Sequence, residues 1–132
     1  MPPPMGEPRG SPEDLVRSRF FPPEAIMGAQ QQLGISDAQR AALVAEIQKS
    51  QAAMTPLQWQ LTAAAEQLAT LADAPRVDEA KVMAQADKVM ALERELKRAH
   101  LTLLVRIKNL LSEEQQAKLR AFGPGPMHRP GP

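Results

Sequence analysis

Large apolar residues recur at heptad spacing along two long stretches of the chain. In residues 36–72 the repeat consists of Leu43, Ile47, Met54, Leu57, Leu61, Leu68 and Leu71. After residue 78 it consists of Val82, Val89, Leu96, Leu103 and Leu110, flanked by Ala86, Leu92, Ala99 and Ile107. Residues seven positions apart lie on one face of an α-helix, two turns from each other. The pattern therefore predicts two long helices, each with an apolar packing seam.

Proline and aspartate residues set the predicted limits of these helices. In "DAPRVD", Pro75 ends the first long helix and Asp78 is placed to cap the second, so the two form an antiparallel hairpin. Pro56 lies inside the first long helix and removes one backbone hydrogen bond there. Because the heptad continues through Pro56 without a change of phase, we expect a kink rather than a loop.

Shorter segments flank the predicted hairpin. "RSRFFPPEAIMGAQQQLG" predicts a short first helix that begins near Pro22 or Pro23 and stops at Gly34. Its apolar side consists of Ile26, Met27 and Leu33. A short last helix follows Ser112. The predicted fold class is thus all-α: a helical domain over 22–122 between a disordered proline-rich tail over 1–21 and a disordered Gly/Pro tail over 123–132.

The sequence contains the same helix opening twice, as "ISDAQ" and "LSEEQ". In each copy a serine is followed three residues later by a glutamine, and an aliphatic residue precedes the serine. Such a serine can accept from the glutamine amide, while the glutamine side chain accepts from the serine amide, which forms a capping box. The predicted motif residues are Ile35, Ser36, Gln39, Leu111, Ser112 and Gln115.

Composition and charge exclude several classes of function. Sixteen basic and fifteen acidic residues leave a formal charge of +1, too little for a general nucleic-acid-binding surface. There is no cysteine, no transmembrane-length apolar run and no signal peptide in this sequence, so we expect no membrane insertion. No phosphate-binding loop, H-E-x-x-H motif or serine triad is recognisable, and the chain is not expected to be an enzyme.

The predicted hairpin is too thin to cover its own apolar residues. At 1.5 Å per residue each long helix measures roughly 50 Å, and the chain offers no third helix of that length. The short first and last helices can cover only the ends. A second copy is the most economical cover, so a homodimer is favoured over a monomer.

At "ISDAQ" and "LSEEQ" the chain resembles the Spy/CpxP family of periplasmic LTxxQ-motif proteins, with serine in place of threonine in both motifs. The order of a short helix, a first motif, a long hairpin and a second motif also resembles that family. "MTPLQWQL" is similar to the proline-bearing second helix of its heavy-metal-resistance branch. The resemblance implies a periplasmic, curved, all-helical dimer without an active site.

The resemblance also implies a metal-sensor function, but this sequence contains few of the metal-binding residues that such a function requires. That branch holds nickel or cobalt with a histidine pair on the first helix, a glutamate on the second, and a histidine followed four residues later by methionine on the third. The first helix has no histidine, and Leu104 stands four residues after His100. Glu93 and His100 would lie about 10 Å apart on one helical face. We expect His100 to be a half-buried polar residue of the seam and no cofactor to be needed, with a divalent transition metal as the alternative.

The chaperone function that the resemblance implies requires a surface that is both apolar and charged. Methionines on the seams suit contacts with many different chains, although plain core packing explains each one as well. The third helix also carries a basic cluster, which a solvated face would explain equally. The candidate client-binding residues are Met54, Met83, Met90, Arg94, Lys97, Arg98 and Arg106. The predicted partners are unfolded or stress-signalling proteins, and a coiled-coil adaptor that binds a partner helix is a second alternative.

Overall fold

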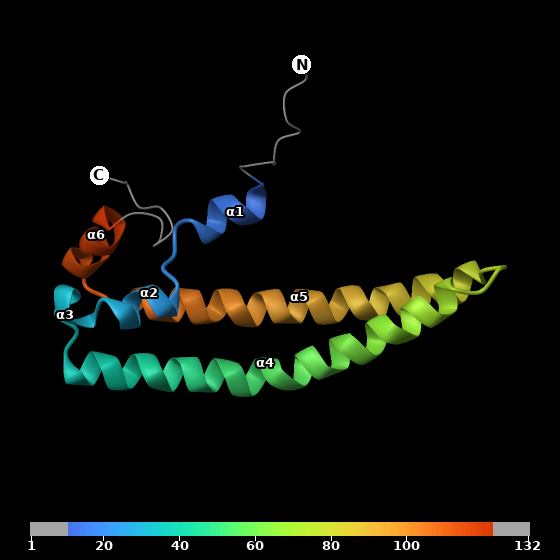
Figure 1. Cartoon of the computed structure of the whole chain (residues 1–132), viewed down its shortest axis with the longest axis horizontal. Helices are drawn as coiled ribbons and strands as arrows, with labels where there is room; N and C mark the ends of the chain where they lie inside the picture. Colours follow the sequence, from blue (N-terminus) through green and yellow to red (C-terminus); the bar gives the residue numbers. More distant parts are fainter. Residues whose placement is uncertain (1–10, 123–132) are drawn as a thin grey trace, which may run out of the picture. The chain divides into compact units, whose positions relative to one another are not determined.

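The computed structural model describes residues 11–122, and within that range all regular structure is helical (Figure 1). The helices are α1 (Pro12–Arg17), α2 (Pro23–Gly28), α3 (Gln30–Leu33), α4 (Asp37–Ala72), α5 (Glu79–Asn109) and α6 (Glu113–Ala121). They belong to two compact units. The first unit contains residues up to 40 and from 104 onward, and the second contains residues 41–103. The all-α prediction is therefore confirmed.

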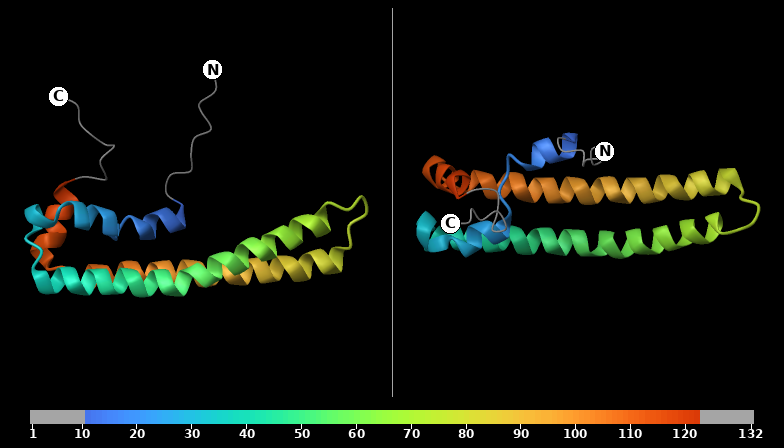
Figure 2. Two further views of the ribbon diagram at one scale, coloured as in Figure 1. Left: turned by 60° about the horizontal axis from the view of Figure 1, so that its bottom comes forward. Right: turned by 45° about the horizontal axis from the view of Figure 1, so that its top comes forward.

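The second unit is an antiparallel pair formed by the long helices α4 and α5, which lie side by side in both figures (Figures 1 and 2). Asp78 starts α5 as predicted, because its Oδ1 accepts a hydrogen bond of 3.1 Å from the backbone N–H of Lys81. This bond satisfies one of the amides that the first turn of a helix leaves without an intrahelical partner. The chain thereby reverses between Ala72 and Glu79 without further secondary structure.

Helix α4 continues through Pro56, so the prediction of a helix rather than a loop is confirmed. Its axis changes direction about midway along its length (Figure 1). Proline cannot donate to the carbonyl of Ala52 and its ring crowds that carbonyl. The preceding Thr55 adds to the effect, because its hydroxyl donates to the Gln51 carbonyl at 2.8 Å, a contact that bends helices. The bend thus has two adjacent local causes.

The seam between the two long helices is only partly buried. Within residues 41–103 the buried residues are Leu43, Gln85 and Leu103, and the other heptad residues are half-buried. Gln85 is polar, and its side-chain amide donates to the Ala64 carbonyl at 2.9 Å. The hydroxyl of Ser50 is also buried and finds no partner among the described residues. A two-helix layer with polar groups in its seam supplies little hydrophobic stabilisation of its own.

The first unit contains most of the buried apolar side chains. They come from α2, α3, α5, α6 and the connections beside these helices. The buried residues are Phe21, Ile26, Leu33, Leu104, Ile107, Leu111 and Leu119. Ile26 and Ile107 have no exposed surface. Helix α3 contacts both α2 and α6. Short helices can form a core here because several of them converge on the last turns of α5.

The predicted first helix is divided in two, which corrects the expectation of one helix. It begins at Pro23 as expected, but Ala29 leaves the helical region with φ of −116° and ψ of 26°. The side-chain amide of Gln30 donates to the Met27 carbonyl at 3.0 Å and so replaces a backbone donor at the break. Gly34 ends α3 as predicted, with a left-handed φ of 70°.

The expectation of a disordered tail over residues 1–21 needs correction for its described part. Residues 12–17 form α1, whose N-cap is Ser11, and Phe21 is buried. Lys108 holds this region, because its Nζ donates to the Arg19 carbonyl at 3.0 Å and lies 5.5 Å from the centre of the Phe20 ring. Residues 1–10 and 123–132, where the remaining tail predictions fall, lie outside the described residues.

A helix that spans a bilayer must be both long and apolar. Within residues 11–122 no helix combines a sufficient length with a sufficiently apolar stretch to span a membrane.

Two glycine substitutions test the left-handed turn at the end of α3. Alanine at either Gly28 or Gly34 would find open space, so the backbone alone decides the outcome. We expect Gly34→Ala to lower the free energy of unfolding by about 1 kcal/mol, because alanine is disfavoured at positive φ. Gly28→Ala, inside α2, should instead be neutral or raise it by up to about 1 kcal/mol. Urea unfolding followed by circular dichroism measures both, and equal effects would contradict this account.

Candidate functional site

Both predicted capping boxes are present. At the start of α4 the backbone N–H of Gln39 donates to Ser36 Oγ at 3.0 Å, and the N–H of Ser36 donates to Gln39 Oε1 at 3.0 Å. At the start of α6 the corresponding distances for Ser112 and Gln115 are 3.1 Å and 2.9 Å. Each box satisfies two backbone donors that the helix itself leaves unpaired.

The two motif glutamines also bind each other. Nε2 of Gln39 donates to Oε1 of Gln115 at 2.8 Å, and Nε2 of Gln115 donates back to Oε1 of Gln39 at 3.1 Å. We call this reciprocal pair of side-chain amides the glutamine clasp. It joins residues 76 positions apart in the sequence, so the two repeated motifs form one structural site in the first unit.

The clasp also binds the backbone of two turns. Gln39 Nε2 donates to the Leu110 carbonyl at 2.9 Å, in the turn between α5 and α6. Gln115 Nε2 lies 3.2 Å and 3.3 Å from the carbonyls of Leu33 and Gly34, in the turn before α4. Each glutamine therefore caps its own helix with its oxygen and holds the other motif's turn with its nitrogen.

Glutamine is the residue type that this geometry requires. Its amide carries an acceptor oxygen and two N–H donors on one planar group. A glutamate retains the capping oxygen but has no donor, and two glutamates here would place like charges side by side. Gln115 is only 7% exposed and Gln39 is half-buried, so unpaired groups at this site would be costly. The motif leucine Leu111 is buried and Ile35 is half-buried beside their serines.

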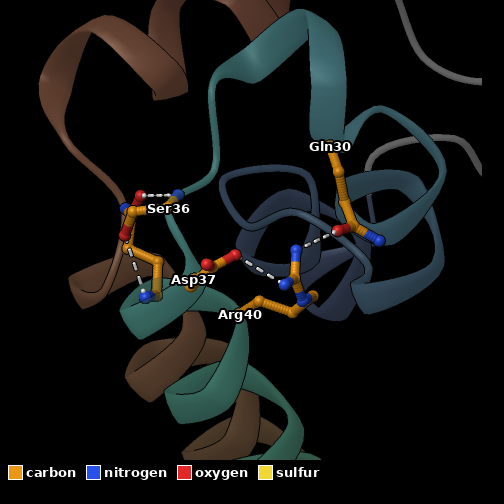
Figure 3. A network of polar contacts seen from close by, with 5 residues as sticks. Gln30, Ser36, Asp37 and Arg40 are labelled. Carbon is orange, nitrogen blue, oxygen red and sulfur yellow. Dashed lines mark hydrogen bonds and ion pairs between the residues drawn. The ribbon is translucent and has the colours of Figure 1, made fainter.

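A second polar network flanks the start of α4 (Figure 3). Arg40 reaches Asp37 Oδ1 at 2.6 Å and Gln30 Oε1 at 3.4 Å. The carboxylate of Asp37 is 94% exposed, so water screens this ion pair and its contribution to stability is small. The network links Gln30 of α3 to the first turn of α4 at the surface.

Sequence reasoning did not identify Gln116 and Lys108, although both act in the first unit. The Gln116 side-chain amide lies 3.2 Å from the Lys108 carbonyl and 3.3 Å from the Leu111 carbonyl, at the free carbonyl end of α5. The second glutamine of "LSEEQQ" could have indicated that Gln116 binds backbone carbonyls near its own helix. Lys108 could not be identified from the sequence, because its aromatic neighbours Phe20 and Phe21 are close to it only in the folded chain.

The methionines proposed for client binding divide between two surfaces. Met54 is a half-buried seam residue, as expected. Met83 and Met90 do not lie on the seam, which corrects the prediction: they are 52% and 49% exposed. Each follows a seam valine by one residue, and one residue turns the direction of a side chain by about 100° around a helix. They therefore point away from the seam of the hairpin.

The outward face of α5 combines these methionines with basic residues. A shallow hollow of about 380 Å³ is lined by Met90, Glu93, Arg94, Lys97, Arg98 and Leu101. Three of the four predicted basic residues therefore lie together, beside two exposed apolar side chains. We call Met83, Met90, Arg94, Lys97, Arg98 and Leu101 the α5 outer face. Arg106 is exposed but belongs to the first unit, and the structure does not join it to this surface.

His100 is half-buried on α5. Among residues 11–122 no group of three or more histidine, aspartate or glutamate side chains is arranged to hold a metal ion. Transition-metal sites need several convergent ligands, and one imidazole supplies a single nitrogen. The arrangement of the described residues therefore offers no ligand set to which a metal function can be assigned.

The clasp should contribute more to stability than either capping serine. We expect Ser36→Ala and Ser112→Ala each to lower the free energy of unfolding by about 1 kcal/mol. Gln115→Glu should lower it by about 3 kcal/mol, because the capping oxygen remains but the donors to Gln39, Leu33 and Gly34 are lost and a charge is buried. Urea unfolding measures all three variants.

The matched control for the clasp is Gln67→Glu, on an exposed position of α4. It makes the same chemical change and should alter stability by no more than about 0.5 kcal/mol. If Gln115→Glu behaved like Gln67→Glu, the clasp would not be formed in solution.

Metal binding can be tested on the full chain. We expect nickel, cobalt and zinc to bind with Kd values above about 1 µM, because His100 has too few neighbouring ligands. Calorimetric titration measures this, with His128→Ala as a control for the histidine near the C-terminus. Submicromolar binding that survives His128→Ala and disappears in His100→Ala would restore the metal-sensor hypothesis.

A scan against protein-family models matches the model described as "LTXXQ motif family protein" over residues 24–123. The matched region contains both capping boxes, the clasp and the whole hairpin. Searches of curated proteins and of solved structures returned no significant match. Because the family model covers most of the chain, this protein belongs to the LTXXQ motif family, which is the Spy/CpxP-type family.

Proposed function

We propose that this protein is a non-catalytic periplasmic stress protein that acts as an ATP-independent chaperone for partly unfolded clients. The observation that carries the proposal is the α5 outer face, where the exposed Met90 and Leu101 line one hollow with Arg94 and Arg98. Met83 is exposed two turns before Met90 on the same helix. Membership of the Spy/CpxP-type family supports a periplasmic stress role. The finer assignment to chaperone activity rests on the chemistry of this face.

The composition of the face suits weak contacts with many sequences. Methionine is unbranched and polarizable, so it adapts to side chains of different shapes. Guanidinium and ammonium groups attract acidic chains over a distance of about 10 Å at moderate salt. The hollow between Met90 and Leu101 is shallow and open, which suits transient contact with an unfolded segment rather than tight binding of one small molecule.

The alternatives have weaker support from the residues. A metal sensor needs a ligand set, and His100 is the one histidine between residues 11 and 122. A coiled-coil adaptor would bind a partner helix along an apolar seam, whereas the partly buried seam of α4 and α5 contains the polar side chains of Gln85 and Ser50. The α5 outer face is turned away from that seam, which favours client binding.

The chaperone proposal predicts protection of an aggregating client without ATP. At low salt, stoichiometric protein should suppress light scattering by a denatured client, and raising the salt should reduce that protection through screening. The triple variant Arg94→Gln/Lys97→Gln/Arg98→Gln should lose most of the low-salt protection, because it removes the positive charges beside Met90 and Leu101.

The control is Lys49→Gln/Arg76→Gln/Lys88→Gln, which changes the net charge equally at exposed positions outside this face. It should protect the client as well as the wild type does. Absence of protection by the wild-type protein at low salt would refute the chaperone function, and equal losses in both triple variants would refute the role of the α5 outer face.

A further inference from the structure

Met83 and Met90 are the two exposed methionines among the described residues. Their side chains are 52% and 49% exposed, whereas Met27 and Met54 are half-buried. The chain contains no cysteine, so methionine supplies its only sulfur atoms. A thioether that water reaches is also reached by small oxidants such as hydrogen peroxide, which convert it to a sulfoxide. The α5 outer face therefore presents two sulfur atoms to peroxide at nearly equal exposure.

The charges beside these two methionines differ in sign. Helix residues four positions apart are neighbours, with about 6 Å between their Cβ atoms, and helical side chains lean toward the N-terminus. The residue four positions after Met90 is Arg94, and the residue four positions after Met83 is Asp87. Arg94 and Asp87 are both exposed. This geometry brings a guanidinium to Met90 and a carboxylate to Met83.

We propose that Met90 is a site of reversible oxidation to methionine sulfoxide, through which peroxide weakens client binding at the α5 outer face. The second part rests on the proposed chaperone function. In the reaction the sulfur lone pair of Met90 attacks one peroxide oxygen, so an S–O bond forms and the O–O bond breaks. The other oxygen leaves with the electrons of that bond and takes the proton of the transferred oxygen, which yields water. Sulfur is thereby oxidised by two electrons, and the peroxide is reduced.

The hollow around Met90 favours this reaction electrostatically. Negative charge develops on the peroxide oxygen that leaves, and nearby cations stabilise such charge. The hollow is lined by Arg94, Lys97 and Arg98, and Glu93 is the one carboxylate among its lining residues. The carboxylate of Asp87 has the opposite effect on a peroxide that reacts at Met83. We therefore assign the faster reaction to Met90, although Met83 is no less exposed.

Oxidation of Met90 changes both properties that suit the hollow to client binding. The thioether is apolar and adaptable, whereas the sulfoxide is polar, so contacts with apolar client side chains weaken. The new oxygen is also a hydrogen-bond acceptor, and an N–H of Arg94 one turn away can donate to it. A guanidinium engaged in this way is less available to an acidic client. Methionine sulfoxide reductases regenerate the thioether, so the change is reversible.

The site assignment is tested by oxidation rates in the full chain. Hydrogen peroxide is added at low salt, and peptide mass spectrometry follows the sulfoxide at each methionine. Met90 should react faster than Met83 by about threefold or more, because unlike charges stand one turn from the two sulfur atoms. Both should react faster than the half-buried Met27 and Met54. At about 1 M salt the rates at Met83 and Met90 should become equal, since the screening length falls to about 3 Å.

Two neutralising variants are matched controls for the rates. Arg94→Gln should lower the rate at Met90 to that at Met83, and Asp87→Asn should raise the rate at Met83. Equal rates at Met83 and Met90 in the low-salt wild type would overturn the assignment. A difference that survives in Arg94→Gln would do the same.

The effect on client binding is tested by comparing each protein with its own untreated form. After peroxide, the wild type and Met83→Leu should lose about half or more of their low-salt protection, because Met90 has become polar. Met90→Leu should retain its own untreated level, since leucine forms no sulfoxide. Methionine sulfoxide reductase with a thiol reductant should restore the wild type.

Equal fractional losses in the wild type and Met90→Leu would refute the regulation. A loss of protection accompanied by a loss of helical circular dichroism would also refute it, because unfolding would then be the cause. The oxidation rates are measured without a client. An untreated wild type that gives no protection would therefore refute the chaperone function and the regulation with it, while the rates alone decide whether Met90 is the oxidation site.

Discussion

The glutamine clasp is the interaction on which the first unit depends. Its two amides link the turn before α4 to the turn before α6, and they do so through backbone carbonyls of Leu33, Gly34 and Leu110 as well as through each other. These turns have few other means of satisfying their carbonyls, because α3 contains only four residues and Gly34 is left-handed. A buried network of this kind stabilises only when every member is paired. The two copies of the motif are therefore mutually dependent, which gives a physical reason why the same helix opening occurs twice in one chain.

Stability is distributed unevenly between the two units, and this follows from their architecture. Several short helices and the end of α5 enclose Ile26, Ile107 and Leu119 in the first unit. In the second unit each long helix has one neighbour, so its heptad side chains are covered on one side only. The seam also includes Gln85 and the unpaired hydroxyl of Ser50. The described hairpin therefore retains surface for contacts with other chains, at the expense of intramolecular burial.

Local sequence signals predicted the elements well. The capping boxes form through contacts between residues three positions apart, and Asp78 and Gly34 likewise act on their immediate neighbours. The clasp was beyond such reasoning, because nothing in either motif specifies that two turns 76 residues apart meet. The break at Ala29 was not predicted, and the apolar spacing does not require it, because Ile26 and Leu33 would face one side of an uninterrupted helix as well. The error over Met83 was avoidable: once Val82 is a seam residue, helical periodicity already turns Met83 outward.

The same periodicity explains how one hairpin can present two faces with different chemistry. Residues facing away from the seam are free of packing constraints, so their composition reflects contacts with solvent or partners rather than the fold. On α4 these residues are neutral around Trp59, and on α5 they are methionines and basic side chains. Lysine or glutamate is as good a helix former as glutamine, so helix propensity does not require the middle of α4 to be neutral. The outward side of α4 around Trp59 therefore has the neutral and aromatic composition that protein interfaces favour, whereas the outward side of α5 is basic.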